Sequence, residues 1–160
     1  MAISRHEEND AFRIFVRNRN SSVVDQLVAD INKEIEKRID CTQCGACCRG
    51  LMINVTNDEA TQLSKHLDMS TSEFKHKYIE VSNGGQFIIN TIPCHFLNDN
   101  KCTVYENRFN ECREFPHLNK NNFADRLFGT LIHYSICPII FNVIEQLKIE
   151  LNFFSENKNS

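Results

Sequence analysis

Eight cysteines account for most of the chemistry that this 160-residue sequence could perform. Cys41, Cys44 and Cys47 are each separated by two residues, and Cys48 follows directly. This spacing lets a tight loop turn several thiolates towards one centre, and iron–sulfur ferredoxins use a Cys-x2-Cys-x2-Cys run of the same form. Four thiols within eight residues would be prone to oxidation if they stood idle, so the run predicts a metal centre.

Cys137 is the predicted fourth ligand of this first site. Pro138 follows it, and proline suits the first turn of a helix, which would place Cys137 at the N-cap. The N–H groups and the positive dipole end of that helix would stabilise a thiolate. We therefore predict a first site of Cys41, Cys44, Cys47 and Cys137 that holds an iron–sulfur cluster, with 4Fe–4S favoured, or zinc.

The remaining cysteines are Cys48, Cys94, Cys102 and Cys112. They could form a second, tetrahedral zinc-like site, or one or more could be ordinary buried thiols, because free cysteine is among the most buried residue types. Adjacent side chains usually diverge, so we do not expect one metal to take both Cys47 and Cys48. A zinc ribbon would need a further Cys-x2-Cys pair, which the sequence lacks.

Several basic residues lie close to the cysteines in sequence. Arg49, Arg108 and Arg113 could donate to thiolates or cluster sulfides and offset their negative charge, or they could be solvated. His95 and His117 could be ligands or donors to ligands, although surface histidines are the commoner case.

The elements that position these residues are mostly helices. Apolar residues recur at three- and four-residue steps between Val24 and Ile35, which predicts a helix with Ser21 or Ser22 as its N-cap. The pairs Thr56 with Glu59 and Ser70 with Glu73 have the spacing of capping boxes. They predict helices over about 57–67 and 71–80, and a last helix follows Cys137.

Short strands complete the predicted fold. We expect strands over 51–55 and 86–90, and a hairpin over 93–105 that brings Cys94 near Cys102. The predicted class is therefore α+β, a mostly helical small domain with a short β-hairpin, organised around cysteine-ligated metal. We divide it into an N-terminal helical segment (1–40), a cysteine-cluster domain (41–152) and a disordered tail (153–160).

Composition narrows the classes of function. The formal charge is −3 with acids and bases interspersed, so we expect no nucleic-acid partner. No apolar run approaches the ~20 residues that cross a bilayer, and the first residues do not resemble a secretory signal. We therefore expect a cytoplasmic protein without a membrane partner. In a reducing compartment, eight cysteines favour metal binding over disulfides.

The order of the cysteine blocks resembles a known family. The 41–48 run, Pro93-Cys94-x-Phe96-Leu97, Cys102-x-Val104-Tyr105-Glu106-x-Arg108, Cys112-Arg113-x-Phe115-Pro116 and Cys137-Pro138 are similar to the CxxCxxCC proteins of YkgJ type. One departure is Phe109, where the family usually has proline. This departure affects a turn or helix start and leaves every candidate ligand in place. The resemblance implies chelation of zinc or iron.

Three functions are compatible with this sequence. The first is a metal-binding module without catalysis, for structure, storage or delivery. The second is an iron–sulfur redox enzyme, or a relative of flagellin lysine-N-methylase, which joins similar blocks to a longer chain; no GxGxxG loop is present here. The third is a redox sensor. The sequence assigns no reaction, no protein partner and no oligomeric state.

Overall fold

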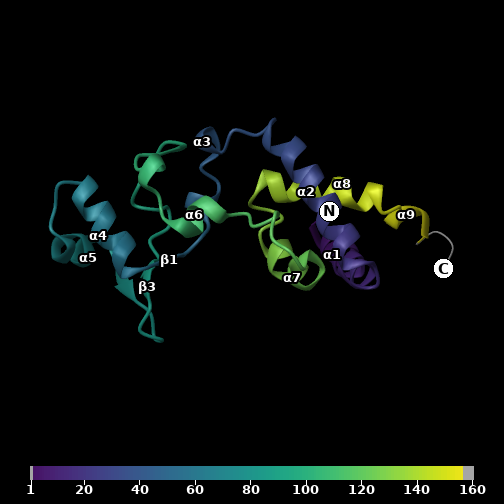
Figure 1. Cartoon of the computed structure of the whole chain (residues 1–160), viewed down its shortest axis with the longest axis horizontal. Helices are drawn as coiled ribbons and strands as arrows, with labels where there is room; N and C mark the ends of the chain where they lie inside the picture. The colour runs from purple at the N-terminus through teal and green to yellow at the C-terminus, as the bar shows by residue number, and fades with distance from the viewer. Residues whose placement is uncertain (1, 157–160) are drawn as a thin grey trace. The chain divides into compact units, whose positions relative to one another are not determined.

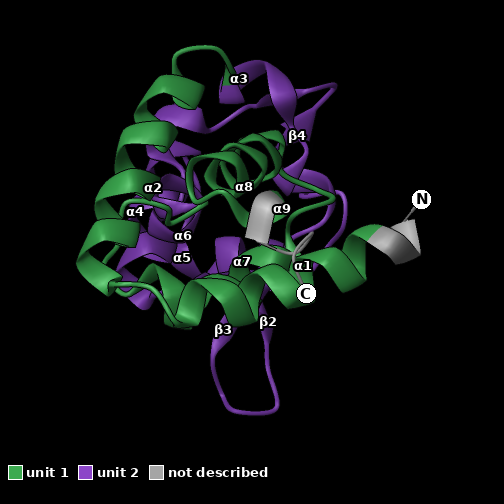
Figure 2. Cartoon of the chain, turned by 90° about the vertical axis from the view of Figure 1, so that its right-hand side faces the viewer, with its two compact units in different colours: residues 1–40, 116–160 green, residues 41–115 purple. Residues whose placement is uncertain are grey.

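The computed structural model describes residues 2–156 and divides the chain into two compact units. The helical unit comprises residues 1–40 and 116–160, and the cysteine unit comprises residues 41–115 (Figure 2). The chain therefore leaves the helical unit after Asp40 and returns to it at Pro116. In the described part of the chain, no helix is long and apolar enough to cross a membrane.

The helical unit is built from amphipathic helices, which Figure 1 labels along the chain. They are α1 (Ala2–Arg17), α2 (Ser21–Glu36), α7 (Phe123–Ile132), α8 (Pro138–Glu150) and α9 (Phe153–Glu156). The predicted stripe of α2 is confirmed, since Val24, Val28 and Ile31 are buried where α2 packs against α7 and α8. The predicted cap was wrong: Asn20 accepts the hydrogen bond from Val23 N (3.2 Å), because it stands one residue before the first helical turn.

The end of the described chain packs onto the same core. The ring of Phe153, at the start of α9, is only 2% exposed and lies 5.1 Å from the ring of Phe12. The first residues of the predicted tail are therefore helical, and residues 157–160 lie outside the described residues.

The cysteine unit alternates short helices with short strands (Figure 1). Its helices are α3 (Cys41–Cys44), α4 (Asn57–His66), α5 (Thr71–Tyr78) and α6 (Asn110–Glu114), with 3-10 turns η1 (Cys47–Arg49) and η2 (Tyr105–Asn107). Its strands are β1 (Ile53–Val55), β2 (Glu80–Val81), β3 (Phe87–Ile89), β4 (Leu97–Asn98) and β5 (Lys101–Cys102). They form an antiparallel sheet in the order β1-β3-β2 and the separate hairpin β4-β5. The predicted α+β class, mostly helical with a short hairpin, is confirmed.

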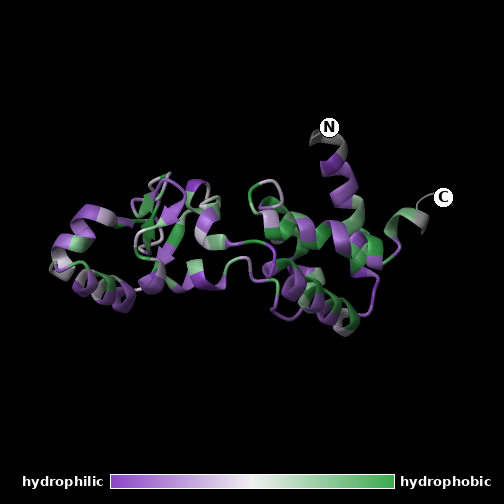
Figure 3. Cartoon of the chain, turned by 90° about the horizontal axis from the view of Figure 1, so that it is seen from above, coloured by the Kyte–Doolittle hydropathy of each residue, from purple (hydrophilic) through white to green (hydrophobic). Residues whose placement is uncertain are grey.

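A hydrophobic core of its own supports the cysteine unit. Phe74 from α5, Ile89 from β3 and Phe96 are buried in it, and Cys94, Cys102 and Cys112 pack against it. Figure 3 shows that α4 and α5 are largely hydrophilic outside this contact, whereas α7 and α8 of the helical unit are rich in hydrophobic residues. Cys94, Cys102 and Cys112 lie at the margin of this apolar core, where burial disfavours the charged form of a thiol.

Candidate metal centre

The turn through the cysteine run depends on Gly45. This glycine is buried and has a φ of +61°, a left-handed conformation that disfavours any residue with a Cβ. A Cβ built on it would lie 2.9 Å from Nη1 of Arg49 and 2.9 Å from the backbone oxygen of Asn100. The turn between Cys44 and Cys47 is therefore made in close contact with another segment of the unit.

Arg49 ties the cysteine run to the β4-β5 hairpin. Its Nη2 donates to the backbone oxygen of Asp99 (2.6 Å) and to Oδ1 of Asn100 (2.5 Å), the two residues between the strands. Its Nη1 donates to the backbone oxygen of Cys44 (3.5 Å). One guanidinium therefore joins Cys44 to the hairpin whose second strand ends at Cys102.

A second set of contacts brings Cys94 to the same region. Its backbone N–H donates to the oxygen of Cys48 (2.7 Å), and its own oxygen accepts from Leu97 N (3.0 Å). Leu97 pairs with Cys102 across the hairpin. These two contacts confirm the predicted approach of Cys94 to Cys102, and the charge of Cys102 helps burial to raise the pKa of Cys94.

Five thiols influence one another electrostatically: Cys47, Cys48, Cys94, Cys102 and Cys112. We call them the five-thiol group. Burial, and then the charges of Cys47, Cys94 and Cys102, raise the pKa of Cys112 to about 12. A hydrogen bond from Cys48 lowers the pKa of Cys47, and the same bond, with burial, raises the pKa of Cys48. All five are partly buried, and none of them is in a disulfide.

The charge of Arg108 acts on two thiols of this group. Its guanidinium carbon lies 3.8 Å from the centroid of the Tyr105 ring, and Nη1 donates to the backbone oxygen of Tyr105 (2.6 Å). Burial raises the pKa of Cys102, and the charge of Arg108 opposes that rise; it also helps to lower the pKa of Cys47. The three arginines that the sequence singled out therefore have different contacts. Arg108 acts on thiols, Arg49 binds the hairpin turn, and Arg113 binds the backbone of residues 106 and 108.

Three further cysteines are candidate ligands, and α3, which carries two of them, contacts β5. Cys41 is exposed at the start of α3, and Cys44 is partly buried at its end. Cys137 is buried at the N-cap of α8 with Pro138 in the first turn, as predicted, and belongs to the helical unit. A site joining Cys41, Cys44, Cys47 and Cys137 stays a prediction.

The two candidate histidines belong to different units. His95 is exposed, and its ring lies 5.2 Å from the ring of Tyr78 in an edge-on contact. His117 belongs to the helical unit, has a φ of +59°, and its backbone oxygen accepts from Arg126.

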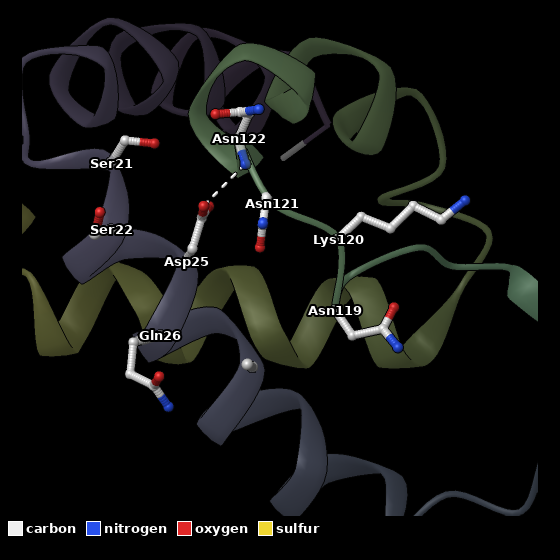
Figure 4. A pocket seen from close by; sticks show the side chains of 9 residues that line it. Ser21, Ser22, Asp25, Gln26, Asn119, Lys120, Asn121 and Asn122 are labelled. Carbon is white, nitrogen blue, oxygen red and sulfur yellow. Dashed lines mark hydrogen bonds between the residues drawn. The ribbon is translucent and has the colours of Figure 1, made fainter.

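A polar hollow of about 500 Å³ lies in the helical unit (Figure 4). It lies between the start of α2 and residues 119–122, and Asp25 at its wall accepts hydrogen bonds from the backbone N–H groups of Asn122 (2.9 Å) and Phe123 (2.8 Å). Asp25 thereby caps α7. The residues lining the hollow include no cysteine or histidine.

The five-thiol group fits a thiophilic metal by its donors. Within the described residues, no three Cys, His, Asp or Glu side chains could hold one ion as they stand. Cysteine side chains have three staggered rotamers, and rotation about χ1 moves a sulfur by roughly 3 Å. Partly buried sulfur donors beside a guanidinium suit zinc or an iron–sulfur cluster better than magnesium or calcium, which prefer oxygen.

A comparison with known families agrees with this donor set. Residues 40–128 match the family model CxxCxxCC, described as a "putative zinc- or iron-chelating domain". The chain belongs to the CxxCxxCC family. The matched segment contains the five-thiol group with Cys41 and Cys44, and Cys137 lies beyond it. No curated protein and no solved structure matches the chain.

Proposed function

We propose that the cysteine unit is a metal chelator whose centre is ligated by Cys47, Cys94, Cys102 and Cys112. The observation that carries this proposal is that backbone contacts and packing against one core bring these thiols together from separate elements or loops of one unit. Four thiols are the usual ligand number of a structural zinc ion and of a 4Fe–4S cluster.

Cys48 has a different part in this proposal. It is next to Cys47 in sequence, and its thiol hydrogen-bonds the Cys47 sulfur. Adjacent side chains seldom bind one ion together, so we assign Cys47 as the ligand of the pair and Cys48 as a donor to its sulfur. The alternative set, in which Cys48 replaces Cys47, leaves Cys47 for a site with Cys41, Cys44 and Cys137.

We favour an iron–sulfur cluster as the content of the centre, and zinc is the alternative. Four thiolates are the usual ligands of a 4Fe–4S cluster, and the charge of Arg108 would offset part of the ~−2 charge of a four-thiolate site. A bound cluster would supply one-electron chemistry, whereas zinc would supply none. A simple chelator would not use this one-electron chemistry. A redox enzyme, a methylase-related protein or a redox sensor would each use it for a different purpose.

Serine substitution tests the ligand set. Cys102→Ser and Cys112→Ser in the full chain should each lose most of the bound metal when the chain is purified without oxygen. Cys48→Ser should retain metal, whereas Cys47→Ser should lose it. Retained metal in both Cys102→Ser and Cys112→Ser would refute the centre, and retention in Cys47→Ser with loss in Cys48→Ser would support the alternative set.

A further inference from the structure

Glu59 is a single carboxylate that caps two helices. Within its own helix α4, Oε2 accepts from the backbone N–H of Thr56 (2.8 Å) and from its hydroxyl (2.8 Å), and Thr56 Oγ1 accepts from Glu59 N (3.2 Å). The other carboxylate oxygen, Oε1, accepts from the backbone N–H of Asn110 (2.7 Å). Asn110 is the first residue of α6, which carries Cys112.

Helix α6 depends on such help from outside. It has five residues, and Phe109 at its N-cap position offers no side-chain acceptor. The first N–H groups of a helix have no partner within the helix, so another group must satisfy them. Glu59 supplies that acceptor across 51 residues of sequence.

Two further contacts fix the residues on each side of Cys112. Glu111 accepts from the backbone N–H of Asn54 in β1 (2.6 Å) through Oε2 and from its side-chain amide (2.8 Å) through Oε1. Arg113 donates through Nε to the backbone oxygen of Arg108 (3.0 Å). The direction of the Cys112 side chain is therefore set by α4, β1 and the segment after η2, and less by α6 itself.

We propose that Glu59 is a positioning residue for Cys112, holding the start of α6 so that this thiol faces the other ligands of the centre. The proposal rests on the proposed function, because it requires that Cys112 bind metal. Groups that orient a ligand commonly change metal affinity by 10–100-fold when they are removed. Oε1 of Glu59, which contacts α6, therefore contributes to metal affinity, whereas Oε2 contributes to the cap of α4.

The chain offers a matched control in Glu73. Its carboxylate forms the same capping box with Ser70 at the start of α5, with distances of 2.8 Å to the backbone nitrogen and 2.7 Å to the hydroxyl. These hydrogen bonds of Glu73 stay within the cap of its own helix. Glu73→Gln therefore reproduces the loss of a capping carboxylate without the contact to α6.

A second variant removes the other partner of the contact. Asn110→Pro deletes the N–H that Glu59 accepts, and proline is well tolerated at the first position of a helix. The residue before a proline must be extended, and Phe109 already is, with φ −60° and ψ 154°. This variant keeps the α4 cap intact and so remains informative if Glu59→Gln folds poorly.

The experiment measures Zn²⁺ affinity by chelator competition in the full chain, together with the free energy of unfolding by urea. We expect Glu59→Gln and Asn110→Pro each to weaken Zn²⁺ binding by about ten-fold, and the double variant to weaken it no further. Glu73→Gln should stay within about two-fold of the wild type even if it lowers stability. In the Co²⁺-substituted chain, Glu59→Gln should also weaken the thiolate-to-cobalt absorption band.

Cys112→Ser separates the two proposals. Unchanged affinity in Cys112→Ser would mean that Cys112 is not a ligand, which overturns the proposed ligand set and the positioning role together. Loss of affinity in Cys112→Ser, with Asn110→Pro binding Zn²⁺ like the wild type, would overturn the role of Glu59 alone. Equal losses in Glu59→Gln and Glu73→Gln would also overturn it.

Discussion

Replacing Gly45 by alanine tests the close contact between the cysteine run and the hairpin. The left-handed conformation costs an alanine about 1 kcal/mol relative to glycine. The new methyl group would also lie 2.9 Å from the backbone oxygen of Asn100, and overpacking of this kind costs roughly 1–3 kcal/mol. Gly45→Ala should therefore lower the free energy of unfolding by about 3 kcal/mol.

Gly85 provides the control for the backbone part of this cost. Its φ is +80°, and a Cβ built there meets nothing within 4 Å. Gly85→Ala should therefore cost about 1 kcal/mol, from conformation alone. Urea unfolding of both variants measures the difference. Since the clash displaces Asn100 and the Arg49 contact, Gly45→Ala should also weaken Zn²⁺ binding.

Equal destabilisation by Gly45→Ala and Gly85→Ala would refute this reasoning, because it would show that the 41–49 segment does not lie against the hairpin turn. Unchanged Zn²⁺ affinity in Gly45→Ala, with the larger stability loss present, would show instead that this contact does not help to form the metal centre.

Three further predictions follow from charges in the two units. Arg108→Gln should weaken metal binding while Arg108→Lys, which keeps the charge, retains most of it; similar affinities in both variants would contradict an electrostatic role. Burial and neighbouring thiolates raise the pKa of Cys112 to about 12, so a metal must displace its proton, and Zn²⁺ affinity should rise by about ten-fold per pH unit for each proton released. A pH-independent affinity would show that the thiol is already ionised. Lys148 is fully buried with its Nζ 2.8 Å from Glu145, so Lys148→Met should lower the unfolding free energy by about 2 kcal/mol at neutral pH. Burial acts to raise the pKa of Glu145, but hydrogen bonds from Lys148 and Tyr134 hold it below 4.5, so this stabilisation is present above about pH 4.5 and is lost as the pH falls. A Lys148→Met cost that is the same at low and neutral pH, by urea unfolding, would exclude this pairing.

Local features of the fold could be predicted from sequence because their signals are local. The Thr56–Glu59 and Ser70–Glu73 capping boxes are present as expected, since each needs only residues three apart. The hairpin that brings Cys94 to Cys102 also followed from a short turn between apolar runs. The same local evidence misplaced the cap of α2 by a residue, because Asn20 and Ser21 are both good capping residues.

Contacts between distant segments left no such signal. Nothing near Glu59 in sequence indicates that its second oxygen reaches Asn110, and nothing near Arg49 indicates the turn at Asp99. Hydrophobic periodicity shows that a helix has a buried face but not which segment covers it, so the return of residues 116–160 to the helical unit could not be foreseen.

The most direct test of the central claim is the metal and acid-labile sulfide content of the full chain, purified without oxygen, beside the Cys102→Ser/Cys112→Ser double variant. We predict a brown wild-type protein with iron and sulfide in matching amounts, and a double variant that has lost both. A colourless wild type with stoichiometric zinc would mean that the centre binds zinc and not an iron–sulfur cluster, with the ligand set unchanged. A wild type without metal, or a double variant that retains it, would contradict a metal centre built from these thiols.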